Sequence, residues 1–420
     1  SSPGAAVCRR RANKRCSLIM RPTLTMPALT KFIDGTGPVW SGSLFPFLFI
    51  TIACGAVSGF HALIASGTTP KMLANEGQAC FIGYGGMLME SFVAIMALVA
   101  ACIIDPGVYF AMNSPMAVLA PAGVTDVVAS AAQVVSNWGF TVTPDTLNQI
   151  AHEVGEQSII SRAGGAPTLA VGMAYILHGS LGGLMDVSFW YHFAILFEAL
   201  FILTAVDAGT RAARFMLQDL LGVISPGLKQ TSSLPANLLA TALCVLAWGY
   251  FLHQGVVDPL GGINTLWPLF GIANQMLAGM ALMLCAVVLF KMKRQRYAWV
   301  ALLPTSWLLI CTLTAGWQKS FSTDTKVGFL AIANKFQAMI DSGNIPPQYT
   351  ESQLAQLVFN NRLDAGLTIF FMVVVVVLAL FSIKTALAAL KEDKPTAKET
   401  PYQAMPADAD SLVTQAKRAH

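Results

Sequence analysis

Long apolar runs separated by short polar stretches are the dominant pattern along this chain. A membrane-spanning α-helix needs about 20 mostly apolar residues to cross a hydrocarbon core of ~30 Å. Seven stretches approach that length, and they cover residues 45–65, 84–104, 190–206, 236–253, 267–290, 299–317 and 367–390. The pattern therefore predicts an all-α integral membrane protein, folded as a multi-span helical bundle.

The segments between these runs differ in character. Residues 167–184 are glycine-rich and less apolar, so we expect a helix that lies against the bundle or enters it part way. Helix-like stretches at 326–340 and 351–359 predict a small outer cap within residues 318–366. Residues 391–420 hold few large apolar groups, which predicts a mobile cytoplasmic tail.

Positive charge concentrates in three loops, which orients the predicted bundle. Short loops rich in Lys and Arg favour the cytoplasm, so these three loops are predicted to lie inside and the acidic segment 105–165 outside. Seven spans satisfy all of these assignments. The basic residues are Arg211, Arg214 and Lys229 after the third span, Lys291, Lys293, Arg294 and Arg296 after the fifth, and Lys384, Lys391 and Lys394 after the seventh.

Composition supports a membrane protein and excludes several other classes. Charged residues make up 11% of the chain and apolar residues 55%, whereas soluble proteins carry about a quarter charged residues. The net charge of +4 resides in the loops, so we expect no nucleic-acid partner. The eight cysteines show no CxxC or Cys/His metal spacing, and no nucleophile and base are paired. We therefore expect no metal, no cofactor and no enzymatic activity.

The first span contains glycines and hydroxyls that interrupt its apolar pattern. A broken helix inside a bilayer is tolerated where protein or a water-filled cavity satisfies its backbone, and transporters use such breaks to bind solutes. The alternative is that Gly55 and Gly59, four residues apart, let a neighbouring helix approach closely. The substrate-binding candidates in this segment are Gly55, Ser58, Gly59, His61, Ser66, Thr68 and Thr69.

Ionisable groups within predicted spans are costly, by about 3 kcal/mol on the insertion scale, so they need a partner or a function. Glu90 and Glu198 are candidates for proton coupling, with a structural role as the alternative. For His61 the alternatives are contact with the substrate and a satisfied buried histidine. Asp207 and Arg211, spaced i,i+4 at the cytoplasmic end of the third span, are candidates for gating or for fixing a helix end.

Two adjacent amides, Asn274 and Gln275, lie inside the fifth predicted span. Amide side chains are costly in lipid, so these two should face the bundle. There they either join neighbouring helices or line a solute path, and we include both among the substrate-binding candidates.

Several long segments resemble the carbon starvation protein A family. The resemblance begins near residue 21 and runs to the C-terminus. It implies an importer of the bacterial inner membrane, with some members linked to proton-coupled pyruvate uptake and others to peptide uptake in carbon-limited cells. Residues 395–402 are more similar to the pyruvate branch. The segments are ACGAVSGFHALIASGTTPKMLANE, FIGYGGMLMESFVAIMAL, AGGAPTLAVG, FWYHFAILFEALFILTAVDAGTRAARFMLQDLLG and DPLGGINTLWPLFGIANQMLAG.

This family is similar to the LeuT-like (APC) superfamily of transporters, which are built on two inverted five-helix repeats. The resemblance implies that residues 45–65 form the broken first helix of the second repeat and that residues 105–182 cap the site. Residues 1–20 resemble nothing in the family, so we expect the chain to lack the first repeat. The predicted organisation is a non-family segment 1–20, a core 21–290 with an outer loop 105–185, a two-span region 291–390 with its cap, and the tail.

These observations together predict a secondary transporter that imports pyruvate with a proton. The alternatives are a peptide importer, which shares every feature above, and a membrane sensor or assembly partner that does not transport. The expected partners are the solute, the proton and the lipid bilayer, with a homo-oligomer left open.

Overall fold

The computed structural model of the chain describes residues 22–39, 42–73, 75–121, 124–229, 233–257, 262–346 and 349–397. Every regular element within these ranges is helical, which confirms the all-α prediction. The predicted segment 1–20 and residues 398–420 of the predicted tail lie outside the described residues.

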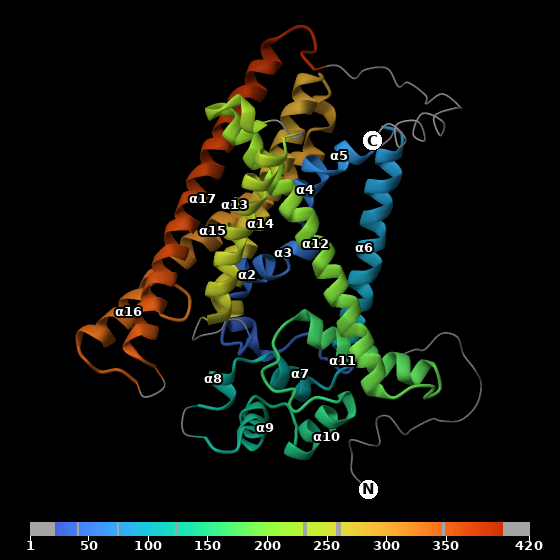
Figure 1. Cartoon of the computed structure of the whole chain (residues 1–420), viewed down its shortest axis with the longest axis vertical. Helices are drawn as coiled ribbons and strands as arrows, with labels where there is room; N and C mark the ends of the chain where they lie inside the picture. Colours follow the sequence, from blue (N-terminus) through green and yellow to red (C-terminus); the bar gives the residue numbers. More distant parts are fainter. Residues whose placement is uncertain are drawn as a thin grey trace.

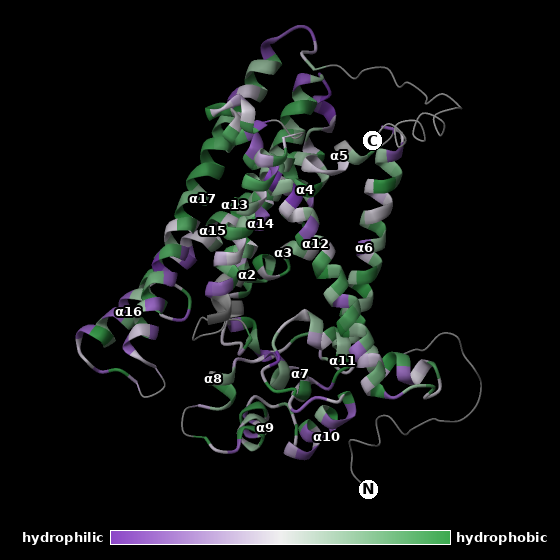
Figure 2. Ribbon diagram, in the orientation of Figure 1, coloured by the Kyte–Doolittle hydropathy of each residue, from purple (hydrophilic) through white to green (hydrophobic). Residues whose placement is uncertain are grey.

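Six helices of the described chain are long and apolar enough to cross a membrane, so the chain is a multi-pass membrane protein. They correspond to six of the seven predicted spans. Hydrophobic residues run along them, and hydrophilic residues gather toward their ends (Figure 2). The six are α6 (Gln78–Cys102), α12 (Val187–Ile224), α13 (Leu234–Val257), α14 (Gly262–Lys291), α15 (Trp299–Phe321) and α17 (Glu351–Lys391).

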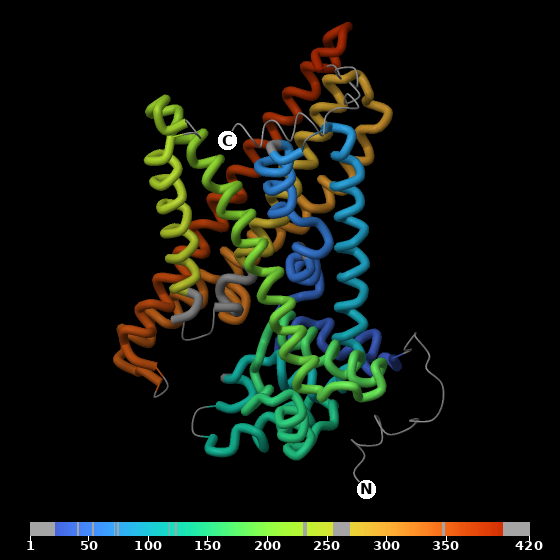
Figure 3. Tube along the Cα trace, turned by 45° about the vertical axis from the view of Figure 1, so that its right-hand side comes forward, coloured from blue at the N-terminus to red at the C-terminus, as the bar shows by residue number. Residues whose placement is uncertain are grey.

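The remaining predicted span, 45–65, is divided into short helices. These are α2 (Leu44–Thr51), α3 (Ala53–Ala56) and α4 (Gly59–Gly67), with α5 (Thr69–Met72) following directly. They succeed one another through the middle of the molecule, beside α12 and α14 (Figures 1 and 3). The interruption predicted from the glycines and hydroxyls is therefore present.

The two ends of the bundle differ. Short helices α7 (Pro106–Asn113), α8 (Met116–Leu119), α9 (Val127–Asn137), α10 (Pro144–Val154) and α11 (Gly165–Ser180) gather at one end (Figure 1). The connections after α12 and α14 and the end of α17 lie at the opposite end, which we call the basic end. They include the 3-10 helices η2 (Pro226–Lys229) and η3 (Gln295–Tyr297). All three predicted cytoplasmic loops thus share one end.

The cap formed by α7–α11 has a hydrophobic core of its own. Val108, Val135 and Leu147 are almost fully buried there. The ring of Phe110 stacks on Phe140, with ring centroids 4.6 Å apart, and meets Phe32 of η1 (Lys31–Asp34) edge to face. Burial of these rings and aliphatic side chains holds together a segment whose helices are individually too short to be stable.

Helix α11 lies where residues 167–184 were expected to form a partial or peripheral helix. It has 16 residues, and it packs against α12 and the C-terminal end of α6. A Cβ atom added at Gly172 would overlap the carbonyl oxygen of Ala100 in α6, so glycine permits this close approach.

The C-terminal region joins the last span to a small helical cluster at the end of the bundle opposite the basic end (Figure 1). Helix α16 (Phe329–Asp341) matches the predicted helix 326–340 and packs Phe336 against Leu354, Leu357 and Val358. Residues 351–359 are helical as predicted, and they form the first turns of the 41-residue α17. A capping box at Thr350 and Gln353 fixes where that helix begins.

Candidate functional site

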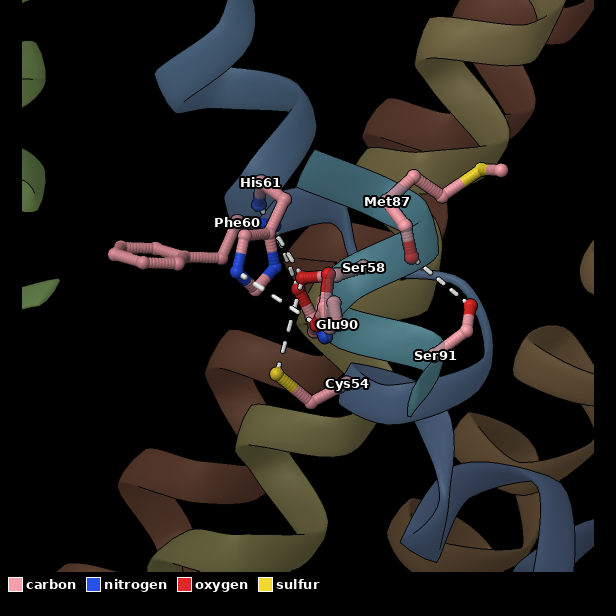
Figure 4. A network of polar contacts seen from close by, with 8 residues as sticks. Cys54, Ser58, Phe60, His61, Met87, Glu90 and Ser91 are labelled. Carbon is pink, nitrogen blue, oxygen red and sulfur yellow. Dashed lines mark hydrogen bonds and ion pairs between the residues drawn. The ribbon is translucent and has the colours of Figure 1, made fainter. Parts of the chain in front are cut away.

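The break between α3 and α4 is the centre of the candidate site. Ser58 has extended backbone angles (φ −93°, ψ 115°) and caps α4, and its hydroxyl oxygen accepts a hydrogen bond from the His61 amide at 3.2 Å. Serine is favoured at this position because its side chain satisfies an amide that the first turn leaves unpaired. The thiol of Cys54 lies 3.8 Å from the same hydroxyl (Figure 4).

Asn274 of α14 holds the first turn of α4. Its side-chain oxygen accepts a hydrogen bond from the Phe60 amide at 2.7 Å, and Asn274 is only 2% exposed. A Cβ atom added at Gly59 would overlap the Asn274 carbonyl oxygen and lie 2.7 Å from the amide nitrogen of Ala278. The absence of a side chain at Gly59 therefore permits the close approach of α14. A Cβ atom added at Gly55, in contrast, would have no neighbouring atom within 4 Å.

Gln275 attaches α14 to the segment before the break. Its amide nitrogen donates to the carbonyl oxygen of Phe49 in α2. A Cβ atom added at Gly271 would lie 2.5 Å from the carbonyl oxygen of Ile50, so glycine permits this close approach of α2 and α14. Within the described chain the Asn274 Nδ2 and Gln275 Oε1 atoms are buried without a hydrogen-bond partner. Both amides thus join helices, and their predicted contact with a substrate stays a prediction.

His61 and Glu90 face each other across the gap between α4 and α6. Their Nε2 and Oε1 atoms are 4.0 Å apart, and the side chains are 46% and 53% exposed (Figure 4). The alternative of a satisfied buried histidine does not describe His61, because nearly half of its side chain is exposed. A titratable pair lies directly beside the helix break, which brings a predicted substrate contact and a predicted proton carrier together.

Glu198 does not belong to this group. The ring of Phe60 packs against Gly209 of α12, and Glu198 precedes Gly209 by eleven residues. At 1.5 Å per residue, Glu198 lies roughly 16 Å farther along the helix axis, toward the α7–α11 cap. It is half-buried, and its carboxylate forms no hydrogen bond with any residue that the structure describes.

The remaining hydroxyl candidates donate to backbone carbonyls of α4. Ser66 donates to the Ala62 carbonyl at 2.9 Å, and Thr68 and Thr69 both donate to the Ile64 carbonyl. Such back-bonding satisfies a hydroxyl in an apolar environment and does not require a ligand. These hydrogen bonds give Ser66 and Thr69 a structural role in α4 and α5.

Thr68 also lines a cavity of about 440 Å³ at the basic end, which we call the arginine cavity. The walls of this cavity include both gating candidates, Asp207 and Arg211. Arg211 Nη2 donates a hydrogen bond to Asp207 Oδ2 at 2.8 Å. The predicted i,i+4 pair is thus present, and its gating role stays a prediction. The other polar lining residues are Thr210, Arg214 and Thr241.

One buried cation was missed by the sequence analysis. Lys319 of α15 is 7% exposed, and its ammonium group lies 5.2 Å from the ring centre of Phe47 in α2 and 5.7 Å from that of Phe329. Asp364 of α17 is buried as well, at 3%. The span predicted at 299–317 ended just before Lys319, so its charge was assigned to the outer loop.

No group of three or more His, Cys, Asp or Glu side chains in the described ranges is placed to hold a metal ion. The polar groups of the site are instead a capped helix break, two interhelical amides and one histidine–carboxylate pair. These features define a helical multi-pass membrane protein with a discontinuous helix in its centre, a class in which polar groups at the break face a solute or ion.

The chain belongs to the family of the carbon starvation protein CstA, whose family model matches residues 14–315. It is 91% identical over 403 residues to the peptide transporter CstA of Escherichia coli (strain K12), covering 96% of this chain and 58% of that protein. It is 57% identical over 407 residues to the pyruvate/proton symporter BtsT of the same organism, covering 93% and 57%.

A third relative is the peptide transporter CstA of Campylobacter jejuni, 60% identical over 303 residues, with 72% of this chain and 42% of that protein covered. No solved structure matches the chain. The family suggested by the sequence segments is therefore confirmed. The chain spans somewhat more than half the length of the two relatives from Escherichia coli, and these relatives carry the names of transporters rather than enzymes.

Proposed function

We propose that this chain forms part of a secondary transporter that imports a small carbon source across a bacterial inner membrane. The observation that carries the proposal is the helix break at Ser58, which places a half-exposed histidine–carboxylate pair beside interrupted backbone inside a multi-span bundle. Interrupted backbone at membrane depth is tolerated only in contact with protein or with a water-filled path. We also propose that residues 45–65 are the broken first helix of the second repeat of an inverted-repeat transporter.

The geometry favours side chains over backbone amides as the solute contacts. Two amides freed at the break, those of Phe60 and His61, are already bonded by Asn274 and Ser58. The exposed His61 ring and the open face at Gly55 remain accessible. In the proposed mechanism a solute carboxylate contacts His61 and the Ser58 hydroxyl, and Glu90 exchanges a proton as the solute enters or leaves.

Short peptides are the first substrate class we propose, because the relative with 91% identity is named a peptide transporter. Pyruvate with a proton is the second, because a relative with 57% identity is named a pyruvate/proton symporter. A free carboxylate is common to both substrates, so a site that recognises a carboxylate beside His61 accommodates either one.

The test is uptake of a labelled dipeptide and of labelled pyruvate into cells that lack their own importers. The chain is compared with a chimera in which the rest of Escherichia coli CstA is added, with and without an uncoupler. His61→Gln and Glu90→Gln should each lower uptake at least tenfold. Ser91→Ala is the matched control, since Ser91 only donates to the Met87 carbonyl of its own helix (Figure 4).

Dipeptide uptake that excess pyruvate does not inhibit would favour short peptides as the substrate class. Pyruvate uptake that excess dipeptide does not inhibit would favour pyruvate. Uncoupler-sensitive uptake supports proton coupling. Wild-type rates in both variants would remove the His61–Glu90 pair from the mechanism. No uptake of either compound by the chain or the chimera, with stable complexes formed in the membrane, would favour a sensor or assembly partner instead.

A further inference from the structure

The arginine cavity toward the basic end holds two cations and one carboxylate, and its second cation, Arg214, meets the ring of Phe215 with 4.9 Å between guanidinium carbon and ring centre. Asp207 pairs with Arg211 at 2.8 Å, which leaves the second cation, Arg214, without an ion-pair partner among the residues that the structure describes. The Nε atom of Arg214 is also buried without a hydrogen-bond partner in that part of the chain. A guanidinium group in a partly enclosed position is stabilised when an anion pairs with it.

Hydroxyl groups stand around this cation. Thr210 of α12 and Thr241 of α13 line the cavity, and neither side chain forms a hydrogen bond with a described residue. Thr68 uses its proton on the Ile64 carbonyl, which leaves its oxygen to accept. Two cations, one carboxylate and three hydroxyls therefore converge on a space of about 440 Å³, within the size range of small-ligand pockets.

We propose that the arginine cavity binds an oxyanion, a carboxylate or phosphate group held by Arg214 and the hydroxyls of Thr210 and Thr241. Guanidinium groups bind these anions through paired, charge-assisted hydrogen bonds. The bound anion also competes with Asp207 for Arg211, so occupancy loosens the Asp207–Arg211 pair. The site is separate from the helix break, and its existence does not depend on the proposed transport.

Two sources supply an oxyanion at this place. One is a small free anion from the aqueous phase, and the other is the phosphate of an anionic lipid, because basic pockets between transmembrane helices on the cytoplasmic side bind headgroups. Helix α5, whose Met72 lines the cavity, lies toward the basic end of the bundle (Figure 1).

The free-anion arm measures binding of inorganic phosphate and, separately, of pyruvate to the full chain in uncharged detergent at low ionic strength. Arg214→Gln should weaken binding by about tenfold or more, as expected for the loss of a charge-assisted contact. Arg296→Gln is the matched control, because Arg296 carries the same charge at the same end but is exposed in η3, outside the cavity. Its affinity should stay within about twofold of wild type.

The lipid arm counts phosphatidylglycerol molecules retained by the protein in native mass spectrometry. The wild type and Arg296→Gln should retain phosphatidylglycerol, and Arg214→Gln should lose it. If neither free anion binds, this result assigns the site to a lipid headgroup. Absence of both kinds of binding, or binding that Arg214→Gln leaves unchanged, overturns the proposal.

A second variant keeps the proposal testable when Arg214→Gln does not fold. Asp207→Asn removes the competing carboxylate from an exposed position and should tighten binding of whichever anion is retained by roughly three- to fivefold. Unchanged affinity in Asp207→Asn would contradict the proposed competition for Arg211 and overturn the site as described.

Discussion

Replacing Asn274 by alanine removes the buried oxygen that holds the first turn of α4 against α14. The Phe60 amide then loses its acceptor at 2.7 Å and stays enclosed by the same helices. An orphaned buried donor costs about 1–3 kcal/mol, and interhelical hydrogen bonds in membranes contribute about 0.6 kcal/mol on average and up to ~1.7. We therefore expect a local destabilisation of about 1–2 kcal/mol, which multiplies the population of the opened turn by roughly 5- to 30-fold.

Hydrogen–deuterium exchange of the full chain in detergent measures this opening directly. In Asn274→Ala the Phe60 amide should exchange faster by that factor, while the caps of α9 and α10 keep their wild-type rates. Ser58→Ala gives an independent comparison, since it frees the His61 amide and leaves the Phe60 bond in place. Asn137→Ala, in an exposed pair with Gln133 on α9, is the matched asparagine control. Unchanged exchange at Phe60 in Asn274→Ala would refute the assignment of Asn274 as the holder of this turn.

Three further substitutions test the packing of the bundle. Gly59→Ala should lower the free energy of unfolding by about 1–3 kcal/mol because its methyl group meets the α14 backbone, whereas Gly55→Ala enters open space and should be neutral in the same detergent denaturation series. Lys319→Ala should lower the free energy of unfolding by about 2 kcal/mol, because it removes two cation–π contacts. Lys326→Ala, at an exposed position, is the control, and equal stability of the two variants would contradict this prediction. Gly172→Leu should separate α11 from α6 and speed proteolysis of the α7–α11 cap, with wild-type resistance as the contrary result.

The spans were predictable because a bilayer imposes a minimum length on apolar helices. Their ends were less predictable. Helix α12 continues to Ile224 although the apolar run stops near residue 206, because no proline occurs before Pro226. The span predicted at 367–390 likewise begins too late, because α17 already contains the charged and amide residues at 360–364. Polarity marks where a helix leaves lipid, whereas helices end at caps and breakers.

The candidate site was predictable in position but not in its contacts. The run of glycines and hydroxyls located the break, because few residues permit interrupted backbone in a membrane. The facing of His61 and Glu90 depends on how α4 and α6 are placed, which spacing along the chain does not contain. Likewise, the sequence could not distinguish a glycine that admits a neighbouring backbone, such as Gly59, from one that stays open, such as Gly55.

The length of α17 has a mechanical consequence. Its 41 residues form one uninterrupted rod of about 60 Å that reaches from the α16 cluster to the basic end. At the basic end Lys293 donates to the Ala389 carbonyl at 2.7 Å, which ties the rod to the connection between α14 and α15. A tilt of about 5° around the middle of such a rod moves its two ends by roughly 3 Å in opposite directions. A displacement of the α16 cluster at one end of α17 would therefore reach the α14–α15 connection at the other end if the rod moves as one body.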